Sequence, residues 1–212
     1  MKRRSVLGIS LAALSTGRAI ADGPALARTT ADLLVEIDHR LENPAVLRGE
    51  FEQTKSIKGF KRPLVSRGTY VVARDRGVQW LTVQPFASTV VVTRERLLTL
   101  GQAGVSRQID TRQEPGLRAI NEMLMALLAG DVTALTARFN VQATLQDTHG
   151  WRLALTPHDA ALAGFIARIE MEGDRHVNAL SLHEASGDAS SIRFFNPASS
   201  GLSATEAERF GP

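Results

Sequence analysis

The sequence contains no cysteine, which excludes disulfide bonds, thiol catalysis and thiolate metal sites. Aromatic residues make up only 5% of its 212 residues, so any large internal cavity would have mainly aliphatic walls. No apolar run is long enough for a transmembrane helix. Lysine is also scarce, because only Lys55, Lys58 and Lys61 lie beyond the first few residues.

The motifs of several enzyme classes are missing as well. The chain has no G-x-S-x-G elbow, no phosphate-binding loop, no G-x-G-x-x-G and no H-E-x-x-H. The five histidines are scattered along the chain. Glu170 and Glu172 share a strand face with Arg168, an arrangement typical of a solvated surface. We therefore predict no catalytic residue, no metal site and no cofactor.

The first 21 residues have the pattern of an export signal. Lys2, Arg3 and Arg4 precede an apolar stretch at 6–14, and Ala19-Ile20-Ala21 is a cleavage site of the A-x-A type. General secretion and twin-arginine export both remain possible. Removing this segment, which carries four cations and no acid, changes the net charge from +3 to −1. The remaining chain thus lacks the basic character of a nucleic-acid-binding protein, and we expect it to be soluble and periplasmic.

Residues 22–212 have the pattern of a single domain that is mainly β. A helix is expected at 29–41, and strands follow to about residue 109, including three between Gly68 and Thr93. A helical insert is expected at about 116–139, more strands between 141 and 196, and a short helix at 204–210. The predicted fold is an antiparallel barrel or a strongly curved sheet, closed or covered by helices.

Two segments could form a hydrophobic cavity. Tyr70, Val72 and Arg74 alternate on one face of a strand, and Val78 and Trp80 share a face of the next strand. Arg74 is then either a surface charge or a residue at the mouth of an apolar cavity. The insert is apolar around much of its circumference, so it either fills the core or forms an adaptable lid.

A basic segment follows the first strand. Lys55, Lys58, Lys61 and Arg62 lie in what reads as a loop, with Arg67 after them. Such a charge run is either a solvated loop or a docking patch for an acidic partner or for anionic lipid head groups.

Four short motifs resemble those of LolA, a family of periplasmic lipoprotein carriers. They are Phe51-Glu52-Gln53, the segment from Arg74 to Trp80, Gln84-Pro85 and Leu155-Thr156-Pro157. The resemblance implies an incomplete antiparallel barrel with a helical lid over an acyl-binding cavity. It also implies that Arg74 controls the lid through hydrogen bonds to helix carbonyls. Asp75 replaces the family's proline and Val78 replaces its aromatic residue, and these departures favour keeping a carrier of another hydrophobic cargo as an alternative.

The resulting functional hypothesis is a periplasmic carrier that delivers acyl chains of lipoproteins or related lipids towards the outer membrane. The alternatives are a carrier of another hydrophobic cargo, such as a glycolipid, polyene or fatty acid, and an enzyme acting on an acylated substrate. An inner-membrane donor and an outer-membrane acceptor are the implied partners, and we expect a monomer. The predicted ligand-binding residues are Phe51, Tyr70, Val72, Arg74, Val78, Trp80, Met123, Leu124 and Leu127; the predicted docking residues are Lys55, Lys58, Lys61 and Arg62.

Overall fold

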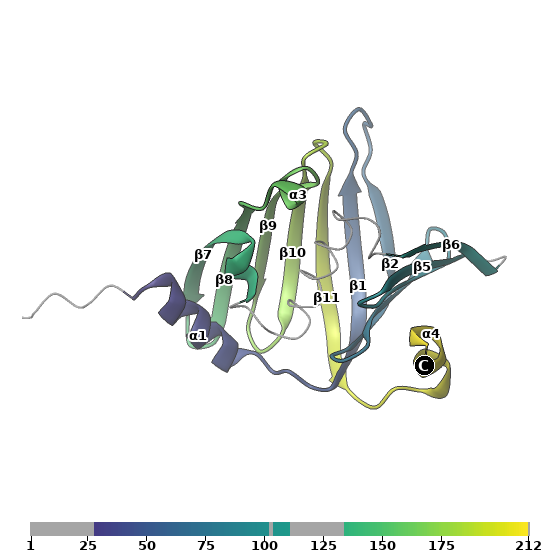
Figure 1. The fold of residues 1–212 in the computed structure, drawn as a ribbon, viewed down its shortest axis with the longest axis horizontal. Helices are drawn as coiled ribbons and strands as arrows, with labels where there is room; N and C mark the ends of the chain where they lie inside the picture. The colour runs from purple at the N-terminus through teal and green to yellow at the C-terminus, as the bar shows by residue number, and fades with distance from the viewer. Residues whose placement is uncertain (1–27, 102–103, 111–133, 212) are drawn as a thin grey trace, which may run out of the picture.

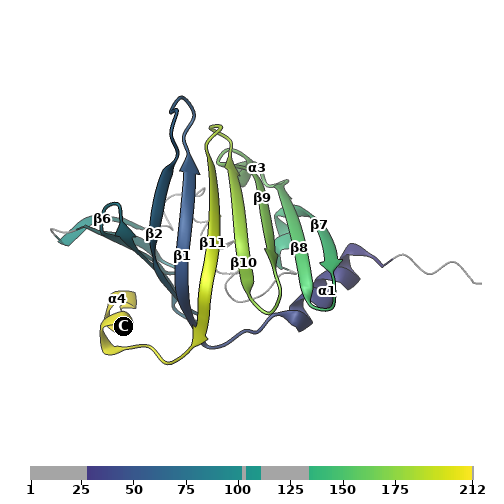
Figure 2. The ribbon, with the colours of Figure 1, turned by 180° about the vertical axis from the view of Figure 1, so that it is seen from behind.

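The computed structural model describes residues 28–101, 104–110 and 134–211, which form one large antiparallel sheet (Figures 1 and 2). Its 11 strands lie in the order β6-β5-β4-β3-β2-β1-β11-β10-β9-β8-β7. The strands are β1 (Val46–Ser56), β2 (Leu64–Ala73), β3 (Gly77–Gln84), β4 (Ser88–Val92), β5 (Arg96–Gly101), β6 (Gly104–Asp110), β7 (Phe139–Gln146), β8 (Gly150–Pro157), β9 (Ile166–Gly173), β10 (Val177–Glu184) and β11 (Ala189–Ser199).

The predicted fold class is confirmed as a strongly curved sheet, and its open form is the correct alternative. β6 and β7 are the two ends of the strand order and do not pair with each other, so the sheet does not close into a barrel. Strands that follow one another in the chain are mostly joined by short turns. β1 and β11 also pair, although they are the first and the last of the described strands in the sequence. This pairing joins the two halves of the chain at the centre of the sheet.

Few helices accompany the sheet in the described residues. They are α1 (Thr30–Arg40), the short 3-10 helix η2 (Ala134–Ala137), α3 (Ala160–Ala163) and α4 (Ala204–Phe210). α1 begins at a capping box in which Thr29 and Asp32 bind each other's backbone N–H groups. α4 begins at the same kind of box, made by Ser203 and Glu206, at the spacing that the sequence predicts.

The strand register divides the side chains between two faces of the sheet. Ala143, Leu153, Met171, Leu180 and Ile192 lie opposite one another on successive strands, so they share one face. We call this the inner face, because Leu34 and Ile37 of α1 pack in its hydrophobic core. The opposite, outer face carries α4 over β2 to β5, where Phe210 packs with Ala73, Val91 and Leu98.

The largest core of the protein fills the inner face over β7 to β10. Trp151, Leu153, Leu155 and Ile169 are at most 2% exposed beneath α1. A second inner-face cluster lies over β11 and β1 to β3, with Phe51, Tyr70 and Val72 as its buried members. The inner face therefore has one half that is covered by α1 and one half to which no described helix contributes.

Several local expectations differ from the structure. Lys55 lies on β1 and Arg67 on β2, so the basic loop is only the tip of the β1–β2 hairpin at 57–63. A register shift between His183 and Glu184 interrupts the alternation of β9, so that Ile166 and Ile169 are both buried while Phe165 is exposed. The helical insert predicted at 116–139 lies mostly outside the described residues, and Phe139 begins β7.

Candidate ligand-binding site

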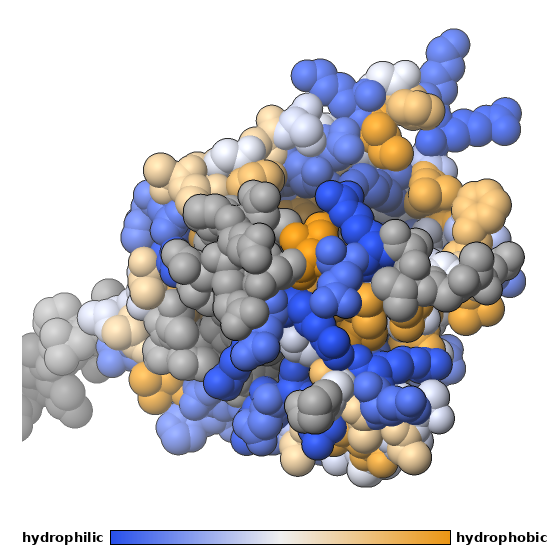
Figure 3. Space-filling model, turned by 45° about the vertical axis from the view of Figure 1, so that its right-hand side comes forward, coloured by the Kyte–Doolittle hydropathy of each residue, from blue (hydrophilic) through white to orange (hydrophobic). Residues whose placement is uncertain are grey.

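Four aromatic side chains meet on the uncovered half of the inner face. The rings of Phe51 and Trp80 stack with their centroids 3.8 Å apart, and Tyr70 lies 6.4 Å from Trp80. Phe194 meets Tyr70 and Trp80 edge to face at 5.3 and 6.1 Å. We call these four residues the aromatic cluster. In Figure 3, hydrophobic side chains on this side of the molecule are bordered by hydrophilic ones.

Strand pairing brings the cluster together. Tyr70 of β2 lies opposite Trp80 of β3, and Phe51 of β1 lies opposite Phe194 of β11. Phe51 also faces Gly68, where a Cβ atom would come within 2.9 Å of the Phe51 ring and 1.8 Å of the Leu81 carbonyl oxygen. The glycine thus leaves the space in which the Phe51 ring can stack on Trp80.

The structure places five of the predicted ligand-binding residues in this one cluster of side chains. Phe51, Tyr70 and Val72 are buried, while Val78 and Trp80 are partly exposed and pack against them. Sequence reasoning missed three further members, Leu47, Ile192 and Phe194. Ile192 and Phe194 are contributed by β11, about 140 residues from β1, so no local pattern could assign them to the site.

The aromatic cluster is uncharged. Its one titratable member is Tyr70, and burial raises the pKa of that phenol above its ordinary value of 10.0, so the ring remains neutral at physiological pH. The hydrophobic side chains that pack with these rings are Leu47, Val72, Val78 and Ile192, and the polar residues Gln53 and Thr82 share the same face of the sheet. A hydrophobic surface of this kind can bind apolar groups by excluding water.

Arg74 lies at the edge of this surface. It follows β2 directly, and its backbone N–H continues the pairing with β1 by donating to Ala45 O at 3.1 Å. Among the described residues, its buried Nε atom has no hydrogen-bond partner. A buried guanidinium donor without a partner is rare in native proteins, so this atom is available for a further acceptor.

The other predicted site residues are not gathered here. Met123, Leu124 and Leu127 lie outside the described residues. Lys55 forms an ion pair with Glu184 at 2.9 Å. Lys58, Lys61 and Arg62 are exposed at the tip of the β1–β2 hairpin.

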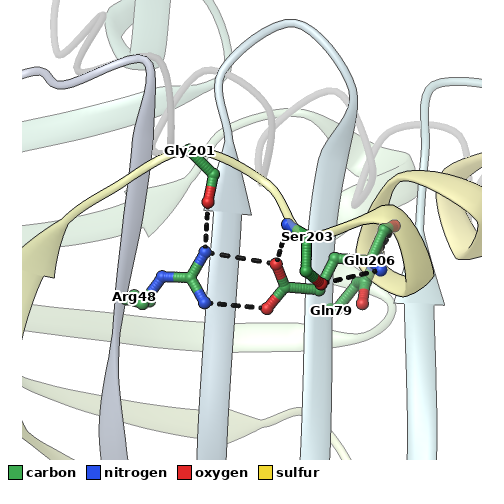
Figure 4. A network of polar contacts seen from close by, with 5 residues as sticks. All are labelled: Arg48, Gln79, Gly201, Ser203 and Glu206. Atoms are coloured by element: carbon green, nitrogen blue, oxygen red, sulfur yellow. Dashed lines mark hydrogen bonds and ion pairs between the residues drawn. The ribbon is translucent and has the colours of Figure 1, made fainter.

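The outer face is closed behind the cluster by α4 (Figure 4). Arg48 donates from Nη1 and Nη2 to the two carboxylate oxygens of Glu206 at 2.8 and 3.1 Å, and from Nη2 to Gly201 O at 2.8 Å. Gln79, which is fully buried, donates to the Glu206 carbonyl. Burial raises the pKa of Glu206, but the hydrogen bonds from Arg48 and Ser203 outweigh it, so the net pKa is lowered.

A hollow of about 460 Å³ lies on this outer side, beside the end of α4. Asp75, Arg76, Arg94, Glu95 and Arg96 line it together with Thr93, Phe210 and Gly211. Its lining is mostly charged, and it belongs to the turns at the end of the sheet rather than to the inner face. It is therefore not the apolar cavity that the sequence predicts.

Within the described ranges, no three His, Asp or Glu side chains are grouped so that they could hold a metal ion. None of the helices in those ranges combines the length and the apolar character needed to cross a bilayer.

The fold is an open antiparallel sheet whose inner face carries a helix on one half and an uncharged aromatic cluster on the other. These features define a curved-sheet protein with a hydrophobic interior. The chain belongs to the LolA family: the family model described as outer membrane lipoprotein carrier protein LolA matches residues 42–207. The resemblance drawn from the four sequence motifs is thereby confirmed. No curated protein is significantly similar to the chain.

Solved structures of low sequence identity are similar to the chain. A LolA superfamily protein from Nitrosomonas europaea is 11% identical, with a TM-score of 0.47, and the match covers 84% of this chain and 97% of that one. A putative outer membrane lipoprotein-sorting protein domain from Vibrio parahaemolyticus is 11% identical, with a TM-score of 0.45 and coverages of 84% and 95%. The Pseudomonas aeruginosa MucA/MucB complex contains a chain that is 16% identical, with a TM-score of 0.44 and coverages of 83% and 60%.

Proposed function

We propose that this protein is a periplasmic carrier that holds the acyl chains of a lipoprotein or related lipid against the uncovered half of the inner face. Membership of the LolA family supports a carrier rather than an enzyme. The observation that carries the proposal is the aromatic cluster, in which partly exposed Trp80 and Phe194 lie beside the aliphatic side chains of Val78 and Ile192. The export signal pattern in residues 1–21 supports the periplasmic location.

A carrier must bind its cargo with limited net affinity, because it also has to release that cargo. Each methylene group buried from water contributes about 0.8 kcal/mol, so full burial of a palmitoyl chain would contribute on the order of 12 kcal/mol. A carrier that bound so tightly would release its cargo too slowly to deliver it. An apolar lid that covers the empty site, and that cargo must displace, lowers the net affinity and permits transfer.

Arg74 is the residue that we propose to control such a lid. The buried Nε atom without a partner at the edge of the inner face supports this role, because a guanidinium can donate several hydrogen bonds to helix carbonyls. In this proposal the part of the predicted helical insert that precedes η2, at about 116–133, is the lid, and Met123, Leu124 and Leu127 contact the cargo. Loading would break the hydrogen bonds of Arg74, and release would restore them.

Native mass spectrometry of the protein isolated from its own cells, followed by extraction of bound material, tests the proposal. A bound acylated protein or lipid is the expected result, and its mass identifies the cargo. A bound polyene, glycolipid or free fatty acid would support the alternative cargo, for which the replacement of the family's aromatic residue by Val78 is the supporting observation. An empty protein that also binds no added lipid would refute the carrier function.

A further inference from the structure

The exposed hydrophobic side chains of this protein are concentrated at one end of the sheet. Eight large hydrophobic residues are exposed in the described part of the chain, and six of them lie at this end, which we call the hydrophobic end. The most exposed are Phe60, at 73%, and Phe86, at 78%. The hydrophobic end consists of Phe60, Leu64, Val65, Val83, Phe86 and Phe165.

Chain topology explains why these residues share one end. Phe60 lies at the tip of the β1–β2 hairpin, and Phe86 lies in the turn between β3 and β4. β2 pairs with β3 through Arg67 and Gln84, so the β1–β2 turn and the β3–β4 turn lie at the same end of the sheet. Phe165 precedes β9 beside the β10–β11 turn, where its carbonyl accepts from Ala185 N at 2.9 Å. The β1–β2 and β10–β11 turns project together in Figure 1.

Positive charge accompanies these hydrophobic tips. Lys58, Lys61 and Arg62 flank Phe60, and the structure gives them no ion pair with any described residue. The neighbouring acids are engaged elsewhere: Glu184 and Asp188 lie 2.9 and 3.9 Å from Lys55 Nζ. Figure 3 shows long hydrophilic side chains beside hydrophobic ones at the projecting upper end of the molecule.

The opposite end of the sheet has a different composition. Its turns, at 74–76, 93–95, 147–149 and 174–176, contain charged and polar residues, and none of their side chains is an exposed large hydrophobic one. Isolated exposed hydrophobic residues are normal on protein surfaces, but the concentration of six of the eight at one end indicates an interaction surface.

We propose that the hydrophobic end docks on the surface of a bilayer that contains anionic phospholipids. Phe60 and Phe86 would enter the boundary between head groups and acyl chains, while Lys58, Lys61 and Arg62 would contact the phosphates. The cations and the negative lipid surface are complementary in charge. Because the aromatic tips belong to separate turns, a protein partner would need two matching pockets, whereas a fluid bilayer adapts to both. This docking goes beyond the proposed carrier function and does not depend on the identity of the cargo.

Co-sedimentation of the purified protein with vesicles tests the proposal. One vesicle preparation contains equal parts of phosphatidylethanolamine and phosphatidylglycerol, and the other contains phosphatidylcholine only. We expect the protein to sediment with the anionic vesicles, to do so more weakly at high salt, and to remain largely in the supernatant with the neutral ones. Sedimentation counts only protein that stays on the vesicles, whereas protein that extracts a lipid as cargo remains in the supernatant, so the assay measures docking rather than cargo loading.

Two variants separate the aromatic and the electrostatic contributions. The Phe60→Ser/Phe86→Ser variant should lower the partition coefficient by about tenfold or more, because it removes both apolar tips. The Lys58→Gln/Lys61→Gln/Arg62→Gln variant should lower it by roughly fivefold for each cation at low salt, and should lose most of the salt dependence. All five side chains are exposed, so circular dichroism should show an unchanged fold.

Matched controls lie elsewhere on the surface. Phe195→Ser removes an exposed phenylalanine from β11, and Arg152→Gln/Arg168→Gln/Arg175→Gln removes the same amount of charge from other exposed positions. Both controls should bind vesicles like the unmodified protein. If the unmodified protein does not sediment with anionic vesicles, or if the Phe60/Phe86 variant binds as well as the Phe195 control, the docking proposal is wrong. Capture of an acidic protein without vesicle binding would overturn it as well.

Discussion

The two halves of the inner face have the same strand geometry but different surroundings. Over β7 to β10, Leu34 and Ile37 of α1 complete a core in which Leu153 and Leu155 are fully buried. Over β11 and β1 to β3, Phe51 is buried by its strand neighbours, while Trp80 and Phe194 keep part of their surface exposed. The first half is thus a folding core, and the second has apolar surface left for another group.

The difference teaches that hydrophobicity alone does not identify a binding surface. Each half carries a cluster of hydrophobic side chains, and the strands of both halves belong to one antiparallel sheet. What separates them is whether a described helix completes the packing. Substitutions in the covered half should therefore act on stability, and substitutions in the uncovered half should act on ligand affinity.

The largest expected effect is on stability in the covered half. Leu153→Ala removes a fully buried side chain beneath α1 and should lower the free energy of unfolding by about 3 kcal/mol, because the surrounding core cannot close the cavity. Urea unfolding followed by circular dichroism measures the change. Leu64→Ala, at a position that is 46% exposed, is the control and should change the free energy by less than about 0.5 kcal/mol. Equal effects would show that α1 does not complete the core.

A smaller effect, on binding, is expected in the uncovered half. Trp80→Ala removes the ring that stacks on Phe51 and should weaken the binding of a fluorescent acyl probe by about tenfold, which corresponds to about 1.4 kcal/mol. Its cost in unfolding free energy should be smaller than that of Leu153→Ala, because the ring is partly exposed. Phe195→Ala on the outer surface is the matched aromatic control. Unchanged probe affinity in Trp80→Ala would remove the aromatic cluster from the site.

The sequence predicts much of this comparison, because local patterns report local structure. Alternation predicts that Tyr70 and Val72 share a face of one strand and that Val78 and Trp80 share a face of the next, and in the structure these two pairs lie opposite each other. The capping spacing from Ser203 to Glu206 identifies α4. These features depend on residues that are close in the chain and on periods of 2 and 3.6 residues.

Long-range features could not be predicted in the same way. The pairing of β1 with β11 adds Phe194 to the cluster, yet nothing near Phe51 in the sequence indicates that partner. At the register shift near Glu184, Ile166 and Ile169 are both buried although strict alternation would put them on opposite faces, and Phe165 is exposed. A bulge of this kind adds one residue to one strand, and strict alternation cannot reveal it.

After stability and affinity, the third property to measure is the rate of cargo release, which depends on Arg74 in the proposed function. Arg74→Leu replaces a buried donor that has no described partner, so it should change the free energy of unfolding by less than about 1 kcal/mol. The same variant should change the release rate of a bound acyl probe by several fold, because the proposed lid loses its hydrogen-bond donor. Stopped-flow fluorescence measures the rate. Arg74→Lys tests whether a positive charge without the guanidinium group is sufficient to keep the release rate of the unmodified protein. A release rate equal to that of the unmodified protein would remove Arg74 from the mechanism.

The smallest expected effect lies on the outer face, where α4 covers the sheet behind the aromatic cluster. The pKa of Glu206 is lowered in the folded protein from its ordinary value of 4.5. The ion pair with Arg48 therefore makes its full contribution to the free energy of unfolding at pH values above 4.5. As the pH falls below 4.5 and through the lowered pKa, this contribution is lost. The loss should be about 1 kcal/mol, because both side chains keep some contact with water.

Glu206→Gln separates this contribution from those of other acids. Asp159 and Asp174 also have lowered pKa values, so the unmodified protein should lose stability at low pH for several reasons. The difference in unfolding free energy between the unmodified protein and Glu206→Gln isolates the carboxylate bound by Arg48. This difference should be largest at neutral pH and should shrink as the pH falls below 4.5. A difference that is constant with pH would mean that the Arg48–Glu206 pair does not stabilise the outer face, and that contacts such as those of Phe210 and Gln79 hold α4 in place.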